Sequence, residues 1–189
     1  SFSNNKATYF PNTNFNGTDS FTYSASDGTV DSEPSTVIIT VSSVNDTPVV
    51  SDVSVSTTEE VSVDISLAAT DVDADNLTYS VVTPPQHGLV TVLANIATYI
   101  PEENYFGLDV FSYKVNDGMV DSNTSAAIIT ITGVNDAPLS TSTSARTFKD
   151  TQANITLTAT DPDGDSLIYS VVTAPDHGTV SISGSTATY

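Results

Sequence analysis

The stretch that decides the fold occurs twice, as "STVIITVSSVNDTP" at residues 35–48 and as "SAAIITITGVNDAP" at residues 125–138. In each copy, a run rich in Val, Ile and Thr leads into Val-Asn-Asp and then into a proline. The first part is typical of a β-strand, and the proline cannot donate a hydrogen bond to a β-ladder. Each copy therefore predicts the last strand of one unit followed by a hinge to the next.

The same spacing of 90 residues recurs elsewhere along the chain. "ATDVDADNLTYSVVT" at 69–83 returns as "ATDPDGDSLIYSVVT" at 159–173, and "ATY" occurs at 7–9, 97–99 and 187–189. A fixed period of about the size of a small domain indicates tandem domains. We expect one complete domain at residues 47–136. Residues 1–46 then match the second half of a preceding unit and residues 137–189 the first half of a following one, as in a slice of a longer array.

The central unit contains seven short runs that resemble strands, separated by turns rich in Pro, Gly, Asn and Asp. Seven strands in about 90 residues predict an all-β fold, an immunoglobulin-like β-sandwich. Alternation places Phe111, Tyr113 and Val115 on one face of the sixth run, and Tyr113 is expected near the corner between the fifth and sixth strands. The expected strands cover residues 50–56, 61–70, 77–83, 89–92, 95–100, 110–116 and 125–133.

The composition narrows the classes of partner. Four Lys and Arg stand against 23 Asp and Glu, which gives a net charge of −19 and argues against nucleic acid or an anionic membrane surface. The chain has no Cys, and it has no apolar run near the roughly 20 residues that a membrane-embedded helix needs. Divalent cations and basic partners are favoured instead.

The acidic residues are sorted toward the ends of the predicted sandwich. Loops after the second and sixth strands lie where the chain enters such a domain, and loops after the first and fifth strands lie where it leaves. Hard oxygen ligands converging from several loops suit Ca²⁺, whereas Zn²⁺ would favour His or Cys. Turn capping by Asp and Asn is the alternative. The residues concerned are Asp71, Asp73 and Asp75, Asp117 and Asp121, Glu59 and Glu60, Glu102, Glu103 and Asp109, and the linker residues Asn45, Asp46, Asn135 and Asp136.

Other chemistries find no support in the residues. The loops at Asp71 and Asp161 lack the Gly and Glu positions of an EF-hand, and no nucleophile elbow, phosphate loop or HExxH motif occurs. His87 and His177 each precede a Gly in a turn and are expected to be structural. We therefore expect no enzymatic activity.

The quoted linkers, the "TDPDGDSL" loop at 160–167 and "NFNGTDSFTY" at 14–23 resemble the bacterial cadherin-like tandem domains of large extracellular adhesins. The resemblance covers the whole chain. It implies a cell-surface location and calcium at the junctions between domains. It also implies a calcium-ligand set, matched position by position: Asn45, Asp46, Asp71, Asp73, Asp117 and Asp19 at the first junction, Asn135, Asp136, Asp161, Asp163 and Asp109 at the second, and Glu59 or Glu60 from the first loop of the central unit.

The resulting expectation is a non-enzymatic spacer in a bacterial surface adhesin, stiffened by calcium between neighbouring repeats and supporting cell adhesion. Two alternatives remain open. The loops or edge strands could bind a cell-surface glycan or protein, or the two complementary half-domains could join between molecules and form a filament.

Overall fold

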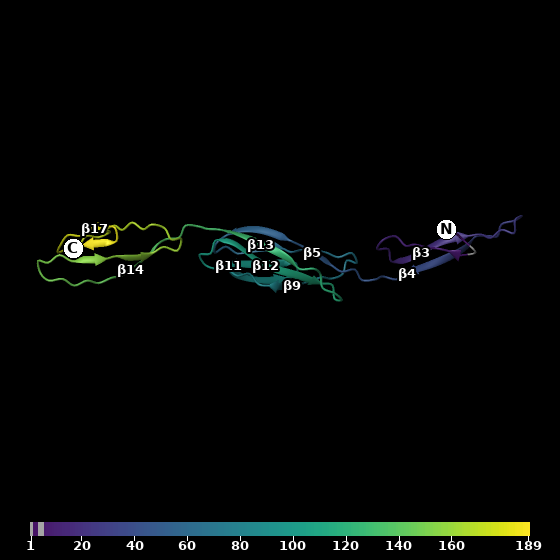
Figure 1. Ribbon diagram of the computed structural model, residues 1–189, viewed down its shortest axis with the longest axis horizontal. Coiled ribbons are helices and arrows are strands. Elements are labelled where there is room, and N and C mark those ends of the chain that lie inside the picture. Colours follow the sequence, from purple (N-terminus) through teal and green to yellow (C-terminus); the bar gives the residue numbers. More distant parts are fainter. Residues whose placement is uncertain (1, 4–5) are drawn as a thin grey trace.

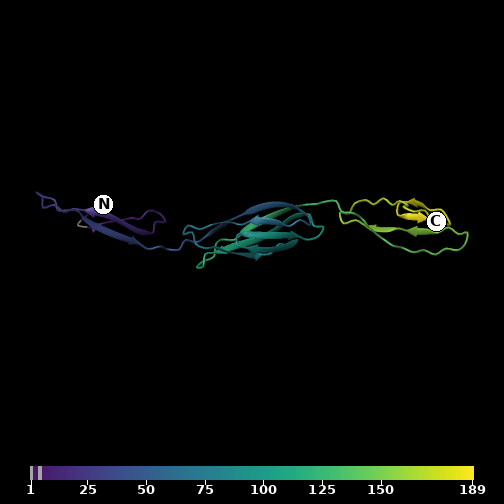
Figure 2. The same cartoon turned by 180° about the vertical axis from the view of Figure 1, so that it is seen from behind.

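The computed structural model describes residues 2–3 and 6–189 of the chain, so the expected unit 1–46 lies partly outside the described residues. Three bodies follow one another along a thin rod, with a complete central unit between two open ones (Figure 1). The view from behind shows the same order, with the N- and C-termini toward opposite ends (Figure 2). The described residues form strands, turns and irregular segments, and they include no helix able to span a membrane.

The central unit is a β-sandwich. One layer contains the sheet β10-β11-β7 and the two-stranded sheet β5-β8, and the other contains the sheet β6-β13-β12-β9. All neighbouring pairs are antiparallel except β6 with β13, which run parallel. The strands are β5 (Val49–Ser51), β6 (Val53–Thr58), β7 (Val63–Ser66), β8 (Ala68–Thr70), β9 (Thr78–Thr83), β10 (Gly88–Leu93), β11 (Ile96–Pro101), β12 (Gly107–Asn116) and β13 (Ser125–Thr132).

Alternating residues from both layers fill the core. Phe111, Tyr113 and Val115 of β12 are fully buried, which confirms the face predicted from the sequence. They belong to one cluster with Ile65 and Tyr99 of the opposite layer. Large aromatic side chains supply much of the buried apolar area, which is the main favourable term in folding of a small domain.

Two strands that the sequence predicts as continuous are divided. The expected strand 50–56 breaks at Asp52 into β5 and β6, and the expected strand 61–70 begins at Val63 and breaks at Leu67 into β7 and β8. The first break has a cause in the contacts, since the carboxylate of Asp52 accepts a hydrogen bond from the backbone N–H of Ala126, 2.8 Å away. As a result, β5 pairs with β8 while β6 crosses to pair with β13.

Tyr113 lies in the middle of β12 and not at the corner between the fifth and sixth strands. Its hydroxyl lies 2.6 Å from the carbonyl oxygen of Ser51 and accepts a hydrogen bond from the N–H of Ala68 at 3.1 Å. A single phenol thus links β12 across the sandwich to both strands of the β5-β8 sheet. This contact satisfies backbone groups next to the break in the first strand.

The outer units contain complementary parts of the same sandwich. Residues 2–3 and 6–46 carry the last two strands as a hairpin, with a short strand pair before it: β1 (Phe2–Ser3), β2 (Lys6–Ala7), β3 (Gly17–Tyr23) and β4 (Ser35–Val41). Residues 137–189 carry the other layer: β14 (Leu139–Thr141), β15 (Asn154–Thr156), β16 (Thr158–Thr160), β17 (Ser181–Ser183) and β18 (Thr186–Thr188).

Candidate metal centre at the junctions

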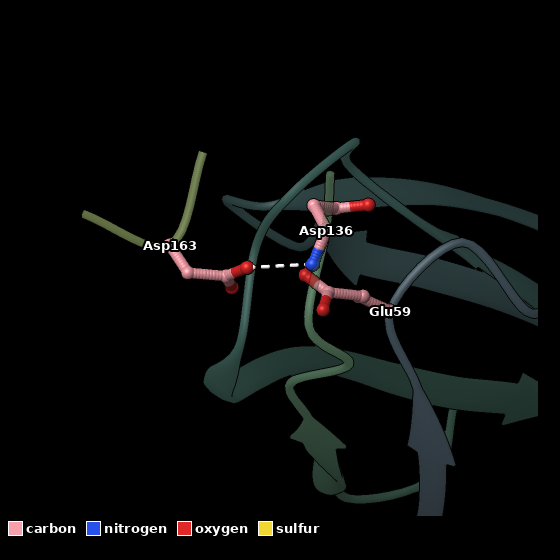
Figure 3. Close-up of side chains that lie close together, drawn as sticks. All are labelled: Glu59, Asp136 and Asp163. Atoms are coloured by element: carbon pink, nitrogen blue, oxygen red, sulfur yellow. Dashed lines mark hydrogen bonds between the residues drawn. The ribbon is translucent and has the colours of Figure 1, made fainter. Parts of the chain in front are cut away.

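Three carboxylates from three separate segments meet at the second junction. Glu59 lies in the turn after β6, Asp136 in the linker after β13, and Asp163 in the loop after β16. One oxygen from each lies within 4.8 Å of the other two, so that all three could contact one ion (Figure 3). The two units and the linker between them each contribute one side chain.

Glu59 is the most buried member of this cluster. Its side chain is 4% exposed, and Oε1 accepts a hydrogen bond from the backbone N–H of Val134 in the linker. The other oxygen, Oε2, is buried without a hydrogen-bond partner among the described residues, and so is Oδ2 of Asp136. A buried carboxylate oxygen without a hydrogen-bond partner costs folding free energy unless a cation or a further donor compensates it.

The linker also bonds directly to the next unit. The backbone N–H of Asp136 donates to Oδ2 of Asp163 at 2.7 Å (Figure 3). Burial raises the pKa of the Asp136 carboxyl, and the nearby negative charges of Asp163 and Glu59 raise it further. The crowding of like charge that the sequence shows as a pattern is therefore a physical feature of this junction.

Asp161 organises the loop that presents Asp163. Its Oδ1 accepts hydrogen bonds from the N–H groups of Asp163 at 3.0 Å and Asp165 at 3.1 Å. Carboxylate oxygens of Asp161, Asp163 and Asp165 also lie within 4.8 Å of one another. Turn capping therefore accounts for one carboxylate oxygen of Asp161. The other oxygen remains available to bind a cation.

The first junction repeats part of this arrangement. The N–H of Asp46 donates to Oδ2 of Asp73 at 2.7 Å, which matches the Asp136–Asp163 bond 90 residues later. The loop acid Asp71 accepts a hydrogen bond from the N–H of Asp75 at 3.2 Å, and its Oδ2 is buried without a partner within the described residues.

Asp117 adds a contact at the first junction. Its Oδ1 accepts hydrogen bonds from the N–H groups of Met119 and Val120, both at 2.7 Å, so it caps its own turn. Its Oδ2 accepts from the side-chain amide of linker residue Asn45 at 2.9 Å. The amide of Asn45, followed by the turn N–H groups, lowers the pKa of Asp117. Asp117 therefore caps its own turn and also bonds to the linker.

The three units correspond to one family. Residues 1–40, 45–132 and 135–189 each match the model of the bacterial Ig domain. The chain belongs to the bacterial Ig domain family. No curated protein matches the sequence.

Among solved structures, cadherin domains have a fold similar to that of this bacterial Ig chain. Domains EC1-2 of human mucin-like protocadherin share its fold with a TM-score of 0.51 and 16% identity, over 70% of this chain and 78% of that one. Two further likenesses have lower TM-scores: 0.46 for protocadherin gamma B7, at 14% identity over 82% of this chain and 46% of that one, and 0.43 for an endo-fucoidan hydrolase of glycoside hydrolase family 107, at 18% identity over 94% of this chain. The chain spans 30% of the length of that hydrolase.

The bacterial Ig chain directs Glu59, and not Glu60, into the second junction. Glu60 follows it in the turn with a φ of 61°, and its side chain is exposed. Asn135 donates its side-chain amide to the carbonyl oxygen of Asp136 at 3.0 Å, as Asn45 does to Asp46 at 3.1 Å. Each linker amide thus bonds to the carbonyl group of the next linker residue.

Asp109 and its counterpart Asp19 make hydrogen bonds within their own units. Asp109 is buried, and it accepts from the N–H groups of Gln86 at 3.0 Å and His87 at 2.9 Å and from the hydroxyl of Tyr99 at 2.8 Å. Asp19 accepts from the hydroxyl of Tyr9 at 2.9 Å. Neither belongs to the three groups of carboxylates that converge within 4.8 Å in the described part of the chain.

One contributor to the centre carries no signal in the sequence. The backbone N–H of Val134 holds Glu59, yet a backbone group leaves no trace in residue type. The acid of the loop after β6 could not be chosen from sequence either, because Glu59 and Glu60 are identical neighbours. Only the left-handed backbone at Glu60 separates their directions.

Proposed function

We propose that this chain is a non-enzymatic spacer in an extracellular repeat protein, and that calcium bound at its junctions stiffens it. The observation that carries the proposal is the second junction. There, Glu59, Asp136 and Asp163 converge from two units and their linker, and Glu59 and Asp136 each have a buried carboxylate oxygen without a hydrogen-bond partner among the residues that the structure describes. Asp161, in the same loop as Asp163, adds to the negative charge acting on Asp136.

The residues fit a hard divalent cation. Every candidate ligand is a carboxylate or amide oxygen, and Ca²⁺ accepts six to eight such ligands in flexible geometry. When bound, calcium would supply two positive charges that offset the repulsion among these acids. Glu59 belongs to one unit, Asp163 to the next and Asp136 to the linker. An ion held by all three side chains would therefore restrict motion at the hinge between the two units.

The two junctions support the same composite site. The first shows the linker bound to the second and sixth inter-strand loops of the downstream unit, through Asp73 and Asp117. The second shows the linker against the upstream acid Glu59. Each junction contains only part of the set because the outer units are partial. Superimposed at the 90-residue spacing, they give an upstream Glu, a linker Asn-Asp pair and three downstream acids.

Glu59→Gln tests the proposal directly, with Glu60→Gln as the matched control. Glu59→Gln should weaken calcium binding in titration calorimetry by about 10- to 100-fold, since it removes a charged ligand. Glu60→Gln should bind as the wild type does, because the Glu60 side chain is exposed beside the site and not in it.

Small-angle scattering reports the stiffening itself. The wild type should show a longer maximum dimension in calcium than in EDTA, and Glu59→Gln should lose most of that difference at matched calcium. Binding that favours the ordered junction should also raise the melting temperature of the wild type. Identical scattering curves and melting temperatures with and without calcium would refute the spacer mechanism, as would equal calcium affinities of the two variants.

A further inference from the structure

One asparagine at the first junction is followed directly by a glycine. Asn16-Gly17 is the single Asn-Gly pair in the sequence, and it lies where β3 begins. Asn16 belongs to the irregular segment between the turn at residues 13–14 and that strand, and its side chain is exposed. An asparagine before a glycine is the pair most prone to lose its side-chain amide, because glycine has no side chain to obstruct the ring that forms in the reaction.

The turn around this pair is a feature of the repeat. The N–H of Phe15 donates to the carbonyl oxygen of Asn12 at 3.1 Å, and the same bond recurs 90 residues later, in the complete central unit, at 3.2 Å. Gly17 has a φ of 118° and its counterpart Gly107 has a φ of 133°, a range that side-chain-bearing residues rarely adopt. The backbone therefore calls for a glycine at this position in both units.

The residue before the glycine differs between the two units. The central unit has Phe106, which cannot undergo the reaction, where the first unit has Asn16. Phe106 is 55% exposed although its sandwich is complete. The exposure of Asn16 therefore belongs to this position of the repeat and does not depend on how much of the surrounding unit the chain contains.

The side chain of Asn16 is also unrestrained. It makes no hydrogen bond with any residue that the structure describes. A Cβ placed on Gly17 would meet no atom within 4 Å, so the backbone beside the amide has open space as well. By contrast, the amides of Asn45 and Asn116 donate to carboxylates at 2.9 and 2.8 Å. Asn16 thus has the freedom to bend onto its own backbone that these two asparagines lack.

Asn16 lies beside the acids of the first junction. It lines one cavity of about 310 Å³ together with Asp46 and Asp73, and a second of about 420 Å³ together with Asn45, Asp73 and Asp75. A negative charge that arises at this position therefore arises among the carboxylates of the candidate metal centre.

We propose that Asn16-Gly17 is a self-modification site, at which loss of the side-chain amide adds a carboxylate to the first junction and strengthens its binding of calcium. The modification itself needs only water and the chain's own atoms. Its effect on calcium rests on the proposed function, because the new carboxylate belongs to the same junction.

The backbone nitrogen of Gly17 is the nucleophile. After losing its proton, it attacks the side-chain carbonyl carbon of Asn16, and a new C–N bond forms. The bond from that carbon to the amide nitrogen breaks, and this nitrogen takes up a proton and leaves as ammonia. A five-membered succinimide ring remains. Its formation involves no change of oxidation state.

Water opens the succinimide in one of two ways. Addition to one ring carbonyl gives an aspartate, and addition to the other gives an isoaspartate, in which the backbone runs through the former side chain. The sum of both steps is the replacement of an amide by an acid, with one water consumed and one ammonia released. Either product carries a carboxylate that is ionised at neutral pH, so the chain gains one negative charge.

The new carboxylate acts in opposite directions with and without a cation. Without one, it adds to the repulsion among Asp46, Asp73 and Asp75. With calcium, it provides a further charged oxygen, and calcium affinity rises with the number of charged ligands. The first junction would therefore bind calcium more tightly as the protein ages, whereas the second junction, with Phe106 at this position, would not change.

Peptide mass spectrometry of the folded full chain tests the modification. During incubation at neutral pH, Asn16 should be converted to the acid at least about 10-fold faster than any other asparagine of the chain. Mildly alkaline buffer should raise the rate, because the attacking nitrogen must lose its proton. Asn16→Gln is the matched control and should stay intact, since its longer side chain would have to close a six-membered ring. Equal rates at Asn16 and the other asparagines, or conversion that occurs only in urea, would overturn the proposal.

Asn16→Asp tests the effect on calcium, with Thr13→Asp as the control. Thr13 is exposed in the same loop and lines neither cavity, so its substitution adds the same charge outside the site. In a Glu59→Gln background, which weakens the second junction, Asn16→Asp should bind calcium about 10-fold more tightly in titration calorimetry, and Thr13→Asp should bind it nearly as the background does. Equal affinities of the two variants would overturn the effect on calcium.

The two experiments keep this inference apart from the proposed function. If the wild type binds no calcium, the proposed function and the effect of the new carboxylate on affinity both fail. The conversion of Asn16 is measured without calcium, so it stands or falls by mass spectrometry alone.

Discussion

Asp109→Asn measures how a sequence-predicted ligand stabilises the central sandwich. The side chain of Asp109 is 3% exposed, and its two oxygens accept four hydrogen bonds. Oδ1 faces the N–H groups of Gln86 and Val110, and Oδ2 faces the N–H of His87 and the hydroxyl of Tyr99. These bonds anchor the turn before β10 to the first part of β12.

The expected loss of folding stability follows from the groups that donate hydrogen bonds to Asp109. In the best orientation, the new amide keeps one oxygen toward Gln86 and Val110 and turns its NH₂ group toward the N–H of His87. One buried donor then loses its acceptor, at about 1–3 kcal/mol, and two charge-assisted bonds become neutral, at about 1 kcal/mol each. We expect a loss of about 3–5 kcal/mol, out of about 5–13 kcal/mol for a domain of this size. The melting temperature should fall by about 15–30 °C.

Calorimetry in EDTA is the assay, with Asp64→Asn as the control. Asp64 is exposed on β7 and accepts one hydrogen bond from Thr98, so its substitution should cost less than about 1 kcal/mol. A loss below about 1 kcal/mol for Asp109→Asn in EDTA would refute the reasoning. A loss that appears only in calcium would show that Asp109 acts as a ligand.

The acid dependence gives a second readout of the same residue. Burial opposes ionisation, but hydrogen bonds from Gln86, Tyr99 and His87 hold the pKa of Asp109 below its usual value. A lowered pKa in the folded state contributes stability that is present above the unfolded-state pKa and is lost as the pH falls through the folded-state pKa. Asp109→Asn should therefore flatten the fall in stability below about pH 4.

Two further substitutions test the packing of the sandwich. Tyr113→Phe removes the hydroxyl that contacts Ser51 and Ala68, and it should lower the free energy of unfolding by about 1–3 kcal/mol in urea titration, because backbone groups lose their partner. No measurable change would mean that water replaces the phenol. Gly88→Ala places a methyl group 2.5 Å from the Tyr99 ring and 2.6 Å from the carbonyl oxygen of Ile100, and it should cost about 2–4 kcal/mol. A melting temperature equal to that of the wild type would contradict the close approach.

The sequence predicted the fold because its signals are local and repeated. Strand-forming runs at fixed intervals, prolines after "VND" and alternation in β12 each depend on a few neighbouring residues, and the period supplies the same pattern again. The breaks in the first two strands were not predictable in this way. They depend on contacts such as that of Asp52 with Ala126, which is 74 residues away in the chain.

The candidate metal centre was likewise predictable only in part from the sequence. Residue types and spacing by themselves determined that acids and linker amides gather where units meet, since loop positions follow from strand order. Only the tertiary structure decided which of them converge: Glu59 turns into the junction while Glu60 turns out, and Asp109 is turned to donors within its own domain. The physical reason is that the charge of a carboxylate is a property of the residue, whereas the burial and the donors that set its role come from segments far away in the chain.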